Sequence, residues 1–241
     1  MSRLHIATRG ACDWRLRLGD PEKHWKRRAS AMEAAVMWEN ADHIPSRLPP
    51  AIAALFQASE LGEVELLLAV AEHKVPLDGA GGDSQCDVWA LVKAKADIVS
   101  VAVEAKAKEA FGKKNESLAR WLKGGKSPRS APNRVTRWAH IEKNLPERGG
   151  GAYDGVPFQI LQRCAAAVIE ARRFELSHAA FLVQAFSAPQ ESFGVFERFA
   201  AAVGFPAERN RLHFATVGEV QLGIGWVDCP FASDQEMAAA L

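Results

Sequence analysis

The chain has 241 residues, of which 48% are hydrophobic and 24% are charged, and its formal net charge at pH 7 is +1. This length allows a substantial hydrophobic core, and the charge excludes a molecule that is strongly basic or strongly acidic as a whole. The sequence has no run of about 18 apolar residues and no apolar signal region at its N-terminus, so we expect a cytoplasmic protein without a membrane segment.

Two helices are predicted in the N-terminal quarter. Residues 22–41 carry apolar side chains at helical spacing, and Asp20 and Pro21 before them are typical helix-start residues. A shorter helix is expected at 50–58, because a pair of prolines opens a segment whose apolar residues recur at the same spacing.

Three β-strands are predicted next, at residues 64–71, 87–92 and 98–106. A glycine-rich loop at 78–83 separates the first two, and a tight turn around Lys95 separates the second from the third. The third strand has the clearest pattern, because valines alternate with smaller or polar residues along it.

The rest of the chain continues the alternation of helices and strands. We expect a helix at 116–122, a loop at 124–134, a short helix at 137–144, a long helix at 158–174 with Gln162, Arg163, Glu170 and Arg172 mostly outward, a strand at 179–186, a helix at 192–203, and one or two strands within 211–227 broken by Gly218, Gly223 and Gly225. This order predicts an α/β protein in which helices cover a mixed sheet. We expect one domain over residues 1–241, with a core at about 22–187 and a C-terminal extension at about 188–241.

Two acidic residues on the predicted strands are candidates for chemistry. If the hairpin of the second and third strands has its centre between Lys95 and Ala96, Asp87 lies directly opposite Glu104. Opposed side chains have Cβ atoms roughly 4.5 to 5.5 Å apart, so the two carboxylates converge on one face. Such a pair is repulsive unless a divalent cation binds, and carboxylates with waters are the ligands that Mg²⁺ prefers. A register slip of one residue would set them on opposite faces.

Lys106 extends this arrangement, because it lies two residues after Glu104 and projects from the same face of the strand. An ammonium beside a bound metal orients the attacking water and neutralises charge in a phosphoryl transition state. The backbone carbonyl of Ala105 offers one more hard oxygen ligand. The alternative interpretation is an exposed strand face on which Glu104 and Lys106 form a salt bridge.

The string of Asp87, sixteen further residues and Glu104-Ala105-Lys106, on a hairpin that follows a helix and a strand, resembles the D…ExK signature of the PD-(D/E)XK superfamily of restriction-endonuclease-like nucleases. The resemblance covers residues 22–187 and implies a restriction-endonuclease-like mixed sheet with an α-β-β-β-α-β core and a C-terminal elaboration. It also implies that the Asp and the Glu bind Mg²⁺ or Mn²⁺, that the Lys assists the nucleophilic water, and that phosphodiester bonds are hydrolysed, with DNA as the expected substrate.

One position departs from the superfamily signature, because Cys86 stands where the motif has proline. Asp78 and Asp83 are competing acidic candidates, although a glycine-rich loop supports a metal ligand less rigidly than a strand does. Accessory residues are expected from other elements, each with a plain surface role as the alternative: Glu33 and Glu39 on the first helix, Glu109 after the third strand, and Gln159 and Arg163 on the long helix.

Residues 105–148 form the basic part of the chain, with twelve Lys or Arg against four Glu and no Asp. Such a segment can neutralise phosphates, and it equally fits a solvated, partly disordered loop. Trp121 and Trp138 lie among the basic residues and are candidates for stacking on bases, with packing in the core as the alternative. The residues expected to contact nucleic acid are Lys113, Lys114, Arg120, Lys123, Lys126, Arg134 and Arg137.

The spacing of cysteines and histidines predicts no zinc site. The four cysteines, at positions 12, 86, 164 and 229, are too far apart for a CxxC pair, so we expect reduced core residues. The seven histidines show neither HxxxH nor HExxH spacing.

Two functions from different classes fit the sequence. The first is a nuclease that depends on Mg²⁺ or Mn²⁺, and the second is a nonhydrolytic nucleic-acid-binding or assembly protein that kept the same fold. An unrelated α/β enzyme is a third possibility, for which no Walker loop, GxSxG motif or Rossmann fingerprint speaks. The expected partner is nucleic acid, and a homodimer is compatible with either function.

Overall fold

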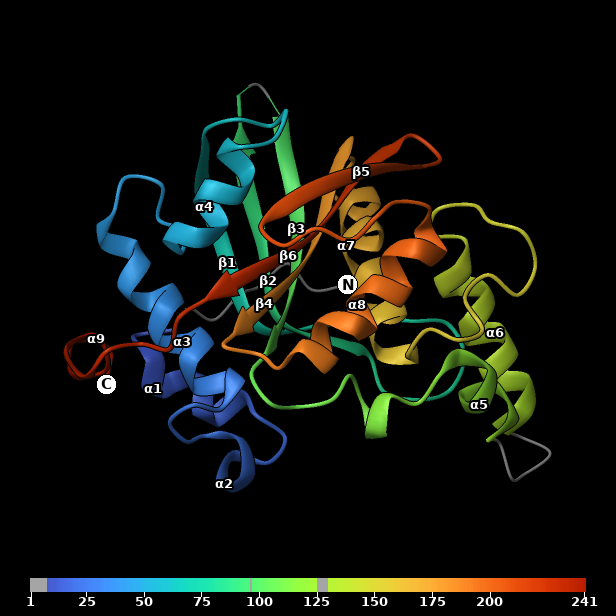
Figure 1. Cartoon of the computed structure of the whole chain (residues 1–241), viewed down its shortest axis with the longest axis horizontal. Helices are drawn as coiled ribbons and strands as arrows, with labels where there is room; N and C mark the ends of the chain where they lie inside the picture. Colours follow the sequence, from blue (N-terminus) through green and yellow to red (C-terminus); the bar gives the residue numbers. More distant parts are fainter. Residues whose placement is uncertain (1–7, 96, 125–129) are drawn as a thin grey trace.

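The computed structural model describes residues 8–95, 97–124 and 130–241. Its centre is a six-stranded sheet with the strand order β1-β2-β3-β4-β6-β5 (Figure 1). Strand β4 is parallel to both of its neighbours, whereas the β1/β2, β2/β3 and β5/β6 pairs are antiparallel. The protein is therefore of the mixed α/β class, as predicted. The strands are β1 (Val64–Val75), β2 (Ser84–Ala94), β3 (Asp97–Lys106), β4 (His178–Phe186), β5 (Arg211–Val217) and β6 (Val220–Cys229).

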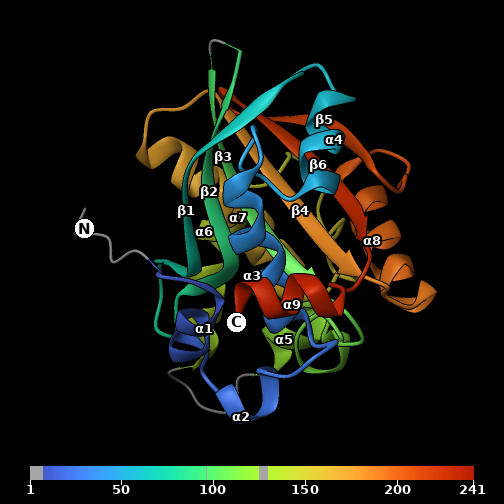
Figure 2. The ribbon, with the colours of Figure 1, turned by 90° about the vertical axis from the view of Figure 1, so that its left-hand side faces the viewer.

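Helices flank the sheet on both faces (Figure 2). One hydrophobic core lies between the sheet and helices α7 and α8, and the other lies between the sheet and helices α3, α4 and α9. Two cores form because alternate residues of a strand point to opposite faces. The α-helices are α1 (Ala11–Trp14), α2 (Pro21–His24), α3 (Ser30–Asn40), α4 (Pro50–Gln57), α5 (Leu118–Lys123), α6 (Ser130–Glu142), α7 (Phe158–Arg173), α8 (Gln190–Val203) and α9 (Asp234–Ala240).

The single helix predicted at 22–41 is two helices, α2 and α3. Asp20 and Pro21 do start a helix, since the Asp20 side chain accepts a hydrogen bond from the Lys23 amide, but α2 is only one turn long. The break comes at Arg28, which has a left-handed φ of 62° and whose amide donates to Glu33 Oε1 at 2.7 Å. The Arg28 amide therefore does not donate to a carbonyl of the preceding turn, as it would in a continuous helix.

The loop predicted at 124–134 is partly helical, because α6 begins at Ser130 and ends at Glu142. Pro132 was one reason to predict a loop, but it lies in the first turn of α6. Backbone N–H groups in the first turn have no acceptor within the helix, so proline is tolerated there. The helices α4, α7 and α8 and the strands β3 and β4 lie close to their predicted places, whereas β1 and β2 are longer than predicted. The segment predicted to hold one or two strands holds two, β5 and β6. Gly223 and Gly225 do not break β6, and Leu212 of β5 packs against both of them.

The segment predicted as a C-terminal extension completes the central sheet. It contributes β6, which lies between β4 and β5 and is mostly buried. The parallel β4/β6 pair needs a crossover connection, and α8 provides it. Residues 188–241 are therefore part of the main hydrophobic core rather than an addition at its edge.

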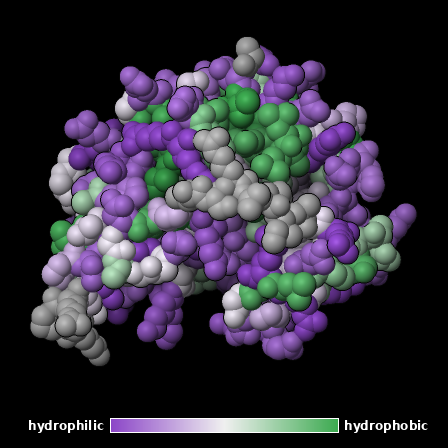
Figure 3. Space-filling model, turned by 180° about the vertical axis from the view of Figure 1, so that it is seen from behind, coloured by the Kyte–Doolittle hydropathy of each residue, from purple (hydrophilic) through white to green (hydrophobic). Residues whose placement is uncertain are grey.

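The predicted reduced, buried state of the cysteines holds for Cys86, Cys164 and Cys229, whereas Cys12 is free but exposed. Within the described ranges, no helix has both the length and the apolar character needed to cross a membrane. The face shown in Figure 3 is mostly hydrophilic, with hydrophobic residues gathered in its upper part.

Candidate active site

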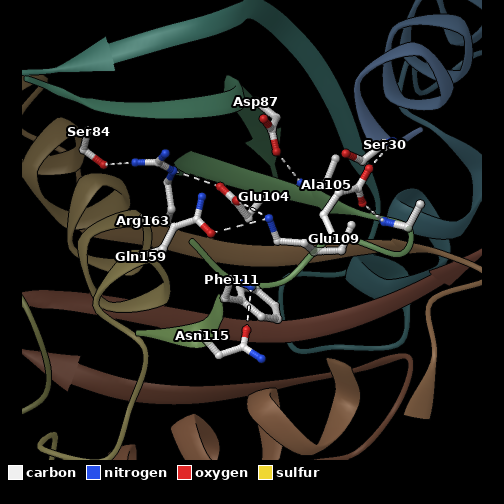
Figure 4. Close-up of polar contacts among 12 residues, drawn as sticks. Ser30, Ser84, Asp87, Glu104, Ala105, Glu109, Phe111, Asn115, Gln159 and Arg163 are labelled. Carbon is white, nitrogen blue, oxygen red and sulfur yellow. Dashed lines mark hydrogen bonds and ion pairs between the residues drawn. The ribbon is translucent and has the colours of Figure 1, made fainter. Parts of the chain in front are cut away.

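The β2–β3 hairpin has the register that was assumed for it, with its centre between Lys95 and Ala96. Val88 pairs with Val103, so the next position sets Asp87 opposite Glu104. The turn lies where it was expected, with Lys95 in the left-handed conformation at a φ of 51°. The two carboxylates therefore come from adjacent strands, and Figure 4 shows them close together in space.

Two cations hold the carboxylate of Glu104, which is 2% exposed. Lys106 Nζ donates to Glu104 Oε1 at 2.7 Å, and Arg163 Nε donates to Glu104 Oε2 at 2.8 Å. Burial alone would raise the pKa of Glu104, but the charges of Lys106 and Arg163 outweigh it and hold this pKa below its ordinary value. Glu104 is therefore an ionised carboxylate in a buried place.

The contacts of Lys106 place its ammonium at the centre of the site. Besides its ion pair with Glu104, Lys106 Nζ lies 3.5 Å from Gln159 Oε1 and 5.1 Å from the centroid of the Phe111 ring. Lys106 is only 5% exposed. The alternative of an exposed salt bridge on the strand surface is therefore wrong, and the accessory candidate Gln159 does reach the site.

Arg163 and Glu170 of α7 were predicted to face mostly outward, and both are buried. Arg163 was also an accessory candidate, and it does reach the site. Arg163 Nη1 donates to Ser84 Oγ at 2.8 Å in addition to its contact with Glu104. Glu170 lies 3.2 Å from Arg173 Nη1 and 3.4 Å from His73 Nε2. Helix α7 packs directly on the sheet, so polar residues on its inner face are tolerated only because partners from distant segments satisfy them.

Asp87 bonds to the backbone of the neighbouring strand. Its Oδ2 accepts a hydrogen bond from the Ala105 amide at 2.6 Å (Figure 4). Burial, and then the nearby charges of Glu104 and Glu72, raise the pKa of Asp87 well above its usual range. Asp87 thus differs from Glu104, because its environment favours the protonated form while that of Glu104 favours the ionised form.

Glu72 is a third carboxylate beside Asp87 and Glu104, and it was not among the predicted site residues. The β1/β2 register pairs Ala71 with Val88 and His73 with Cys86, so Glu72 lies opposite Asp87. The first strand was predicted to end at residue 71, whereas β1 continues to Val75. The pairing rule that joined Asp87 to Glu104 would have identified Glu72 on a longer strand.

The conformation of Glu72 is also unusual. It has a left-handed φ of 54°, and its Oε2 accepts a hydrogen bond from Gln85 Nε2 at 2.5 Å. Burial raises the pKa of Glu72 to about 7, against the lowering effect of the Gln85 bond. We call the site formed by Glu72, Asp87 and Glu104 the carboxylate cleft.

Glu72 is expected to make the stability of the protein depend on pH. Because its pKa rises from 4.5 to about 7 on folding, its contribution is fully present below pH 4.5 and is lost as the pH rises to about 7. Chemical denaturation across this interval should show a smaller fall in the free energy of unfolding for Glu72→Gln than for the wild type. Equal pH profiles for the two proteins would contradict this assignment.

The carboxylate cleft has a volume of about 560 Å³. Its floor comes from β1, β2 and β3, one side comes from the first turn of α7 with Gln159, and another comes from the segment around α2. The cleft thus joins segments that lie far apart in the sequence. Its charged and amide-bearing lining residues, besides Glu72, Asp87 and Glu104, are Asp20, Lys23, His24, Gln85, Lys106, Glu109 and Gln159.

Glu109 lines the cleft, but both of its carboxylate oxygens bind backbone amides. Oε1 accepts from Ser30 N at 3.2 Å and Oε2 accepts from Ala107 N at 2.7 Å (Figure 4). These bonds, after an opposing effect of burial, lower the pKa of Glu109. Glu109 therefore ties the segment after β3 to the start of α3, which keeps two walls of the cleft together.

Four other acidic candidates do not line the carboxylate cleft. Glu33 is buried and accepts hydrogen bonds from the amides of Arg28 and Ala232, and Glu39 accepts from the Trp14 indole at 2.6 Å. Their partners show that they join the N-terminal segment and the C-terminal loop to α3. The two loop competitors, Asp78 and Asp83, also lie outside the cleft.

The residues expected to contact nucleic acid fall into two groups. Lys113, Lys114, Arg120 and Lys123 are exposed, as a surface for phosphates requires. Arg134 is half-buried and Arg137 is buried, so neither is the open surface contact that the sequence suggested. Lys126 lies outside the described residues.

The two candidate stacking residues, Trp121 and Trp138, pack against other side chains. Trp121 stacks on Phe158 with ring centroids 3.6 Å apart, and the Arg134 guanidinium lies 5.0 Å from the Trp121 centroid. Trp138 packs edge-on against Tyr153 at 6.0 Å. The alternative of core packing is therefore the better description of both tryptophans.

Comparison with known proteins gives a family but no activity. Residues 7–230 match the model of a family described as a domain of unknown function, DUF6946. No curated protein matches the chain, and no solved structure does. The match spans nearly the whole chain, including every strand of the sheet and the carboxylate cleft. The chain belongs to the DUF6946 family.

Proposed function

We propose that this protein is a metal-dependent phosphodiesterase that hydrolyses nucleic acid, with DNA as the expected substrate. The observation that carries the proposal is the convergence of Asp87, Glu104 and Lys106 in one cleft. The order of α3, the strands β1 to β3, α7 and β4 supports the restriction-endonuclease-like interpretation, because it matches the α-β-β-β-α-β core of that superfamily.

The donors of the carboxylate cleft suit Mg²⁺ or Mn²⁺. Asp87 and Glu104 offer carboxylate oxygens, and the Ala105 carbonyl points to the Asp87 side because the N–H and C=O of an extended residue point the same way. Within the described ranges, no group of three or more His, Cys, Asp or Glu side chains forms a metal site by itself. Mg²⁺ commonly uses only one or two carboxylates and completes its shell with waters and substrate phosphates.

The side chains of the cleft have distinct roles in this proposal. Asp87 and Glu104 would hold Mg²⁺, which would supply Lewis-acid polarisation of the phosphodiester and a more acidic water. Lys106, whose ammonium lies beside Glu104, would orient the attacking water and stabilise the charge that develops on the phosphate. Arg163 acts as a positioning residue, because it fixes Glu104 Oε2 and keeps this carboxylate ionised. Gln159 restricts the orientation of Lys106.

The nonhydrolytic alternative has one observation in its favour. Both oxygens of Glu104 already bind cations, Oε1 the Lys106 ammonium and Oε2 the Arg163 guanidinium. A carboxylate whose charge is balanced by two neighbouring side chains can have a purely structural role. The raised pKa of Asp87 speaks against a purely structural role, because a buried carboxyl beside two others lowers stability.

Hydrolysis of labelled nucleic acid is the direct test. Duplex DNA, single-stranded DNA and RNA are incubated with the protein and Mg²⁺, then Mn²⁺, with chelator in parallel. We expect metal-dependent cleavage of DNA that Glu104→Gln abolishes. Binding of nucleic acid without cleavage under any of these conditions would instead support the nonhydrolytic alternative.

Binding of nucleic acid is expected to weaken steeply with salt. The exposed cations Lys113, Lys114, Arg120 and Lys123 release counterions from the phosphates they contact, with a log-log slope of about −0.9 per contact on duplex DNA. Replacing all four by glutamine should lower the affinity and make this slope shallower. Fluorescence anisotropy over a salt series measures both, with Lys93→Gln/Arg198→Gln as the control on other exposed surface. An unchanged slope in the fourfold variant would remove this surface from the interface.

A further inference from the structure

A second cleft lies beside the carboxylate cleft and has a different character. Its volume is about 560 Å³, and it lies between the glycine-rich loop before β2, helices α5 and α6, and the first turns of α7. We call it the arginine cleft. Its lining residues are Ala80, Gly81, Gly82, Asp83, Trp121, Ser130, Asn133, Arg134, Arg137, Phe158 and Gln162.

Arg137 is the unusual residue of the arginine cleft. It is 6% exposed, and one end of its guanidinium, Nη2, donates to the Gly82 carbonyl. The other end, Nη1, is buried and has no hydrogen-bond partner among the described residues. A buried N–H of a charged group without a partner is costly, and such groups are normally satisfied by protein, water or a ligand.

The charge around Arg137 favours an anion as the missing partner. Arg134 is a second guanidinium in the same cleft, held in place by the Trp121 ring and the Trp121 carbonyl. The carboxylate in the lining, Asp83, is exposed and does not accept a hydrogen bond from Arg137 Nη1. Two arginines against one aspartate leave a positive cleft, and guanidinium groups match the geometry of phosphate oxygens.

The glycine-rich loop before β2 contacts Arg137 through its backbone, and only glycine fits at two of its positions. Gly81 has a φ of 139°, and a Cβ atom at this position would lie 2.9 Å from Arg137 Nη1. Gly79 has a φ of 80°, and a Cβ there would lie 2.6 Å from the Asn133 carbonyl oxygen. The backbone of this loop therefore lies directly on the buried guanidinium, with no side chain in between.

We propose that the arginine cleft binds a phosphate group through Arg137 and Arg134, and that this phosphate belongs to a nucleic-acid strand whose neighbouring phosphodiester enters the carboxylate cleft. The second half of this inference rests on the proposed function. The two clefts share α7, because Phe158 and Gln162 line one while Gln159 lines the other. The glycine-rich loop also leads directly into β2, which carries Asp87.

Binding of inorganic phosphate tests the site without any need for cleavage. Calorimetry and thermal unfolding are measured with phosphate, and with chloride at matched ionic strength. Wild type should bind phosphate, and Arg137→Lys should weaken this binding about tenfold or more, because lysine lacks the second N–H group of the fork. Arg198→Lys, an exposed arginine on α8, is the matched control and should bind as wild type does.

A second variant keeps the test valid if Arg137→Lys does not fold. Gly81→Ala retains both arginines, places a methyl group against Nη1 and strains the loop backbone at its φ of 139°, so phosphate affinity should again fall about tenfold. Gly151→Ala, at a left-handed φ of 79° and with an ordinary 3.4 Å contact to the Asp154 side chain, is the control for backbone strain. Wild type that ignores phosphate, or a folded Gly81→Ala or Arg137→Lys protein that binds it as wild type does, would overturn the site.

A single-stranded DNA oligonucleotide distinguishes the sources of the phosphate. We expect Gly81→Ala to weaken oligonucleotide binding as well, and phosphate to compete with the oligonucleotide in wild type. Phosphate binding that falls in the variant while oligonucleotide binding stays unchanged would overturn the assignment to nucleic acid. The protein could bind phosphate and the oligonucleotide as expected and yet cleave no nucleic acid. That result would support the phosphate site and contradict the proposed hydrolytic function.

Discussion

Replacing Lys106 by alanine is expected to slow single-turnover DNA cleavage by about 100-fold or more, while the affinities for metal and DNA stay within a few-fold. The ammonium lies 2.7 Å from Glu104 Oε1 and is almost fully buried, so water cannot replace its charge. Beside a bound metal ion, the Lys106 ammonium would be repelled by the metal and attracted to the incipient hydroxide and the phosphate. Its interactions therefore grow in the transition state, and such interactions change turnover more than binding.

Two further variants make the Lys106 result specific. Lys106→Arg should restore little activity, because a planar guanidinium does not fit the place of a compact ammonium between Glu104, Gln159 and the Phe111 ring. Lys108→Ala, two residues later on the exposed surface, should cleave as wild type does. Circular dichroism has to show that Lys106→Ala is folded. Equal cleavage by wild type and a folded Lys106→Ala protein would remove Lys106 from the active site.

Replacing Asp87 by asparagine is expected to have opposite effects on metal binding and on stability. Loss of the carboxylate should weaken Mg²⁺ or Mn²⁺ binding by more than the roughly 10-fold to 100-fold that a residue behind the metal ligands costs. The metal-free protein should become more stable at neutral pH, because burial and the charges of Glu104 and Glu72 disfavour the Asp87 anion. An asparagine oxygen can still accept the Ala105 amide hydrogen bond.

The pH dependence gives this second prediction its sign. A carboxyl whose pKa is raised on folding contributes stability below its unfolded pKa and loses it as the pH rises through the folded pKa. The stability gained in Asp87→Asn should therefore be greatest at high pH and vanish in acid. Calorimetry with Mn²⁺ and chemical denaturation without metal measure the two effects, and Asp97→Asn at the hairpin turn is the control. Unchanged metal affinity in Asp87→Asn would show that Asp87 is not a metal ligand and would contradict the proposed metal site.

The sequence was sufficient for the parts of the site that depend on neighbouring residues. The alternation of valines predicted β3. The hairpin register was an assumption, with its centre between Lys95 and Ala96, and the observed strand pairing agrees with it and sets Asp87 opposite Glu104. The spacing of two between Glu104 and Lys106 required a shared strand face, and their 2.7 Å contact agrees with it. These inferences succeed because strand periodicity and tight turns are governed by local backbone geometry.

The polar partners of these residues came from distant segments and were poorly predicted. Arg163, 59 residues from Glu104, was assigned to the mostly outward side of α7, although it was also an accessory candidate, and its contact with Glu104 agrees with the second interpretation. Glu33 and Glu39 were candidates for accessory residues of the metal site. Their carboxylates instead accept hydrogen bonds from donors of the N-terminal segment and the C-terminal loop. A hydrophobic pattern assigns charged residues to the surface, and it has no means of recognising a buried charge that is paired.

The sequence by itself determined most of the strand-forming segments and the shared strand face of Glu104 and Lys106. The hairpin register that brings Asp87 to them was settled by the strand pairing of the structure. Only the tertiary structure decided that Glu72 joins them, that Arg163 and Lys106 divide the two oxygens of Glu104, and that Arg137 is buried under the glycine-rich loop. The first set follows from the two-residue period of a strand, which a few adjacent residues define. The second depends on which strands and helices become neighbours, and packing of the whole chain selects those neighbours.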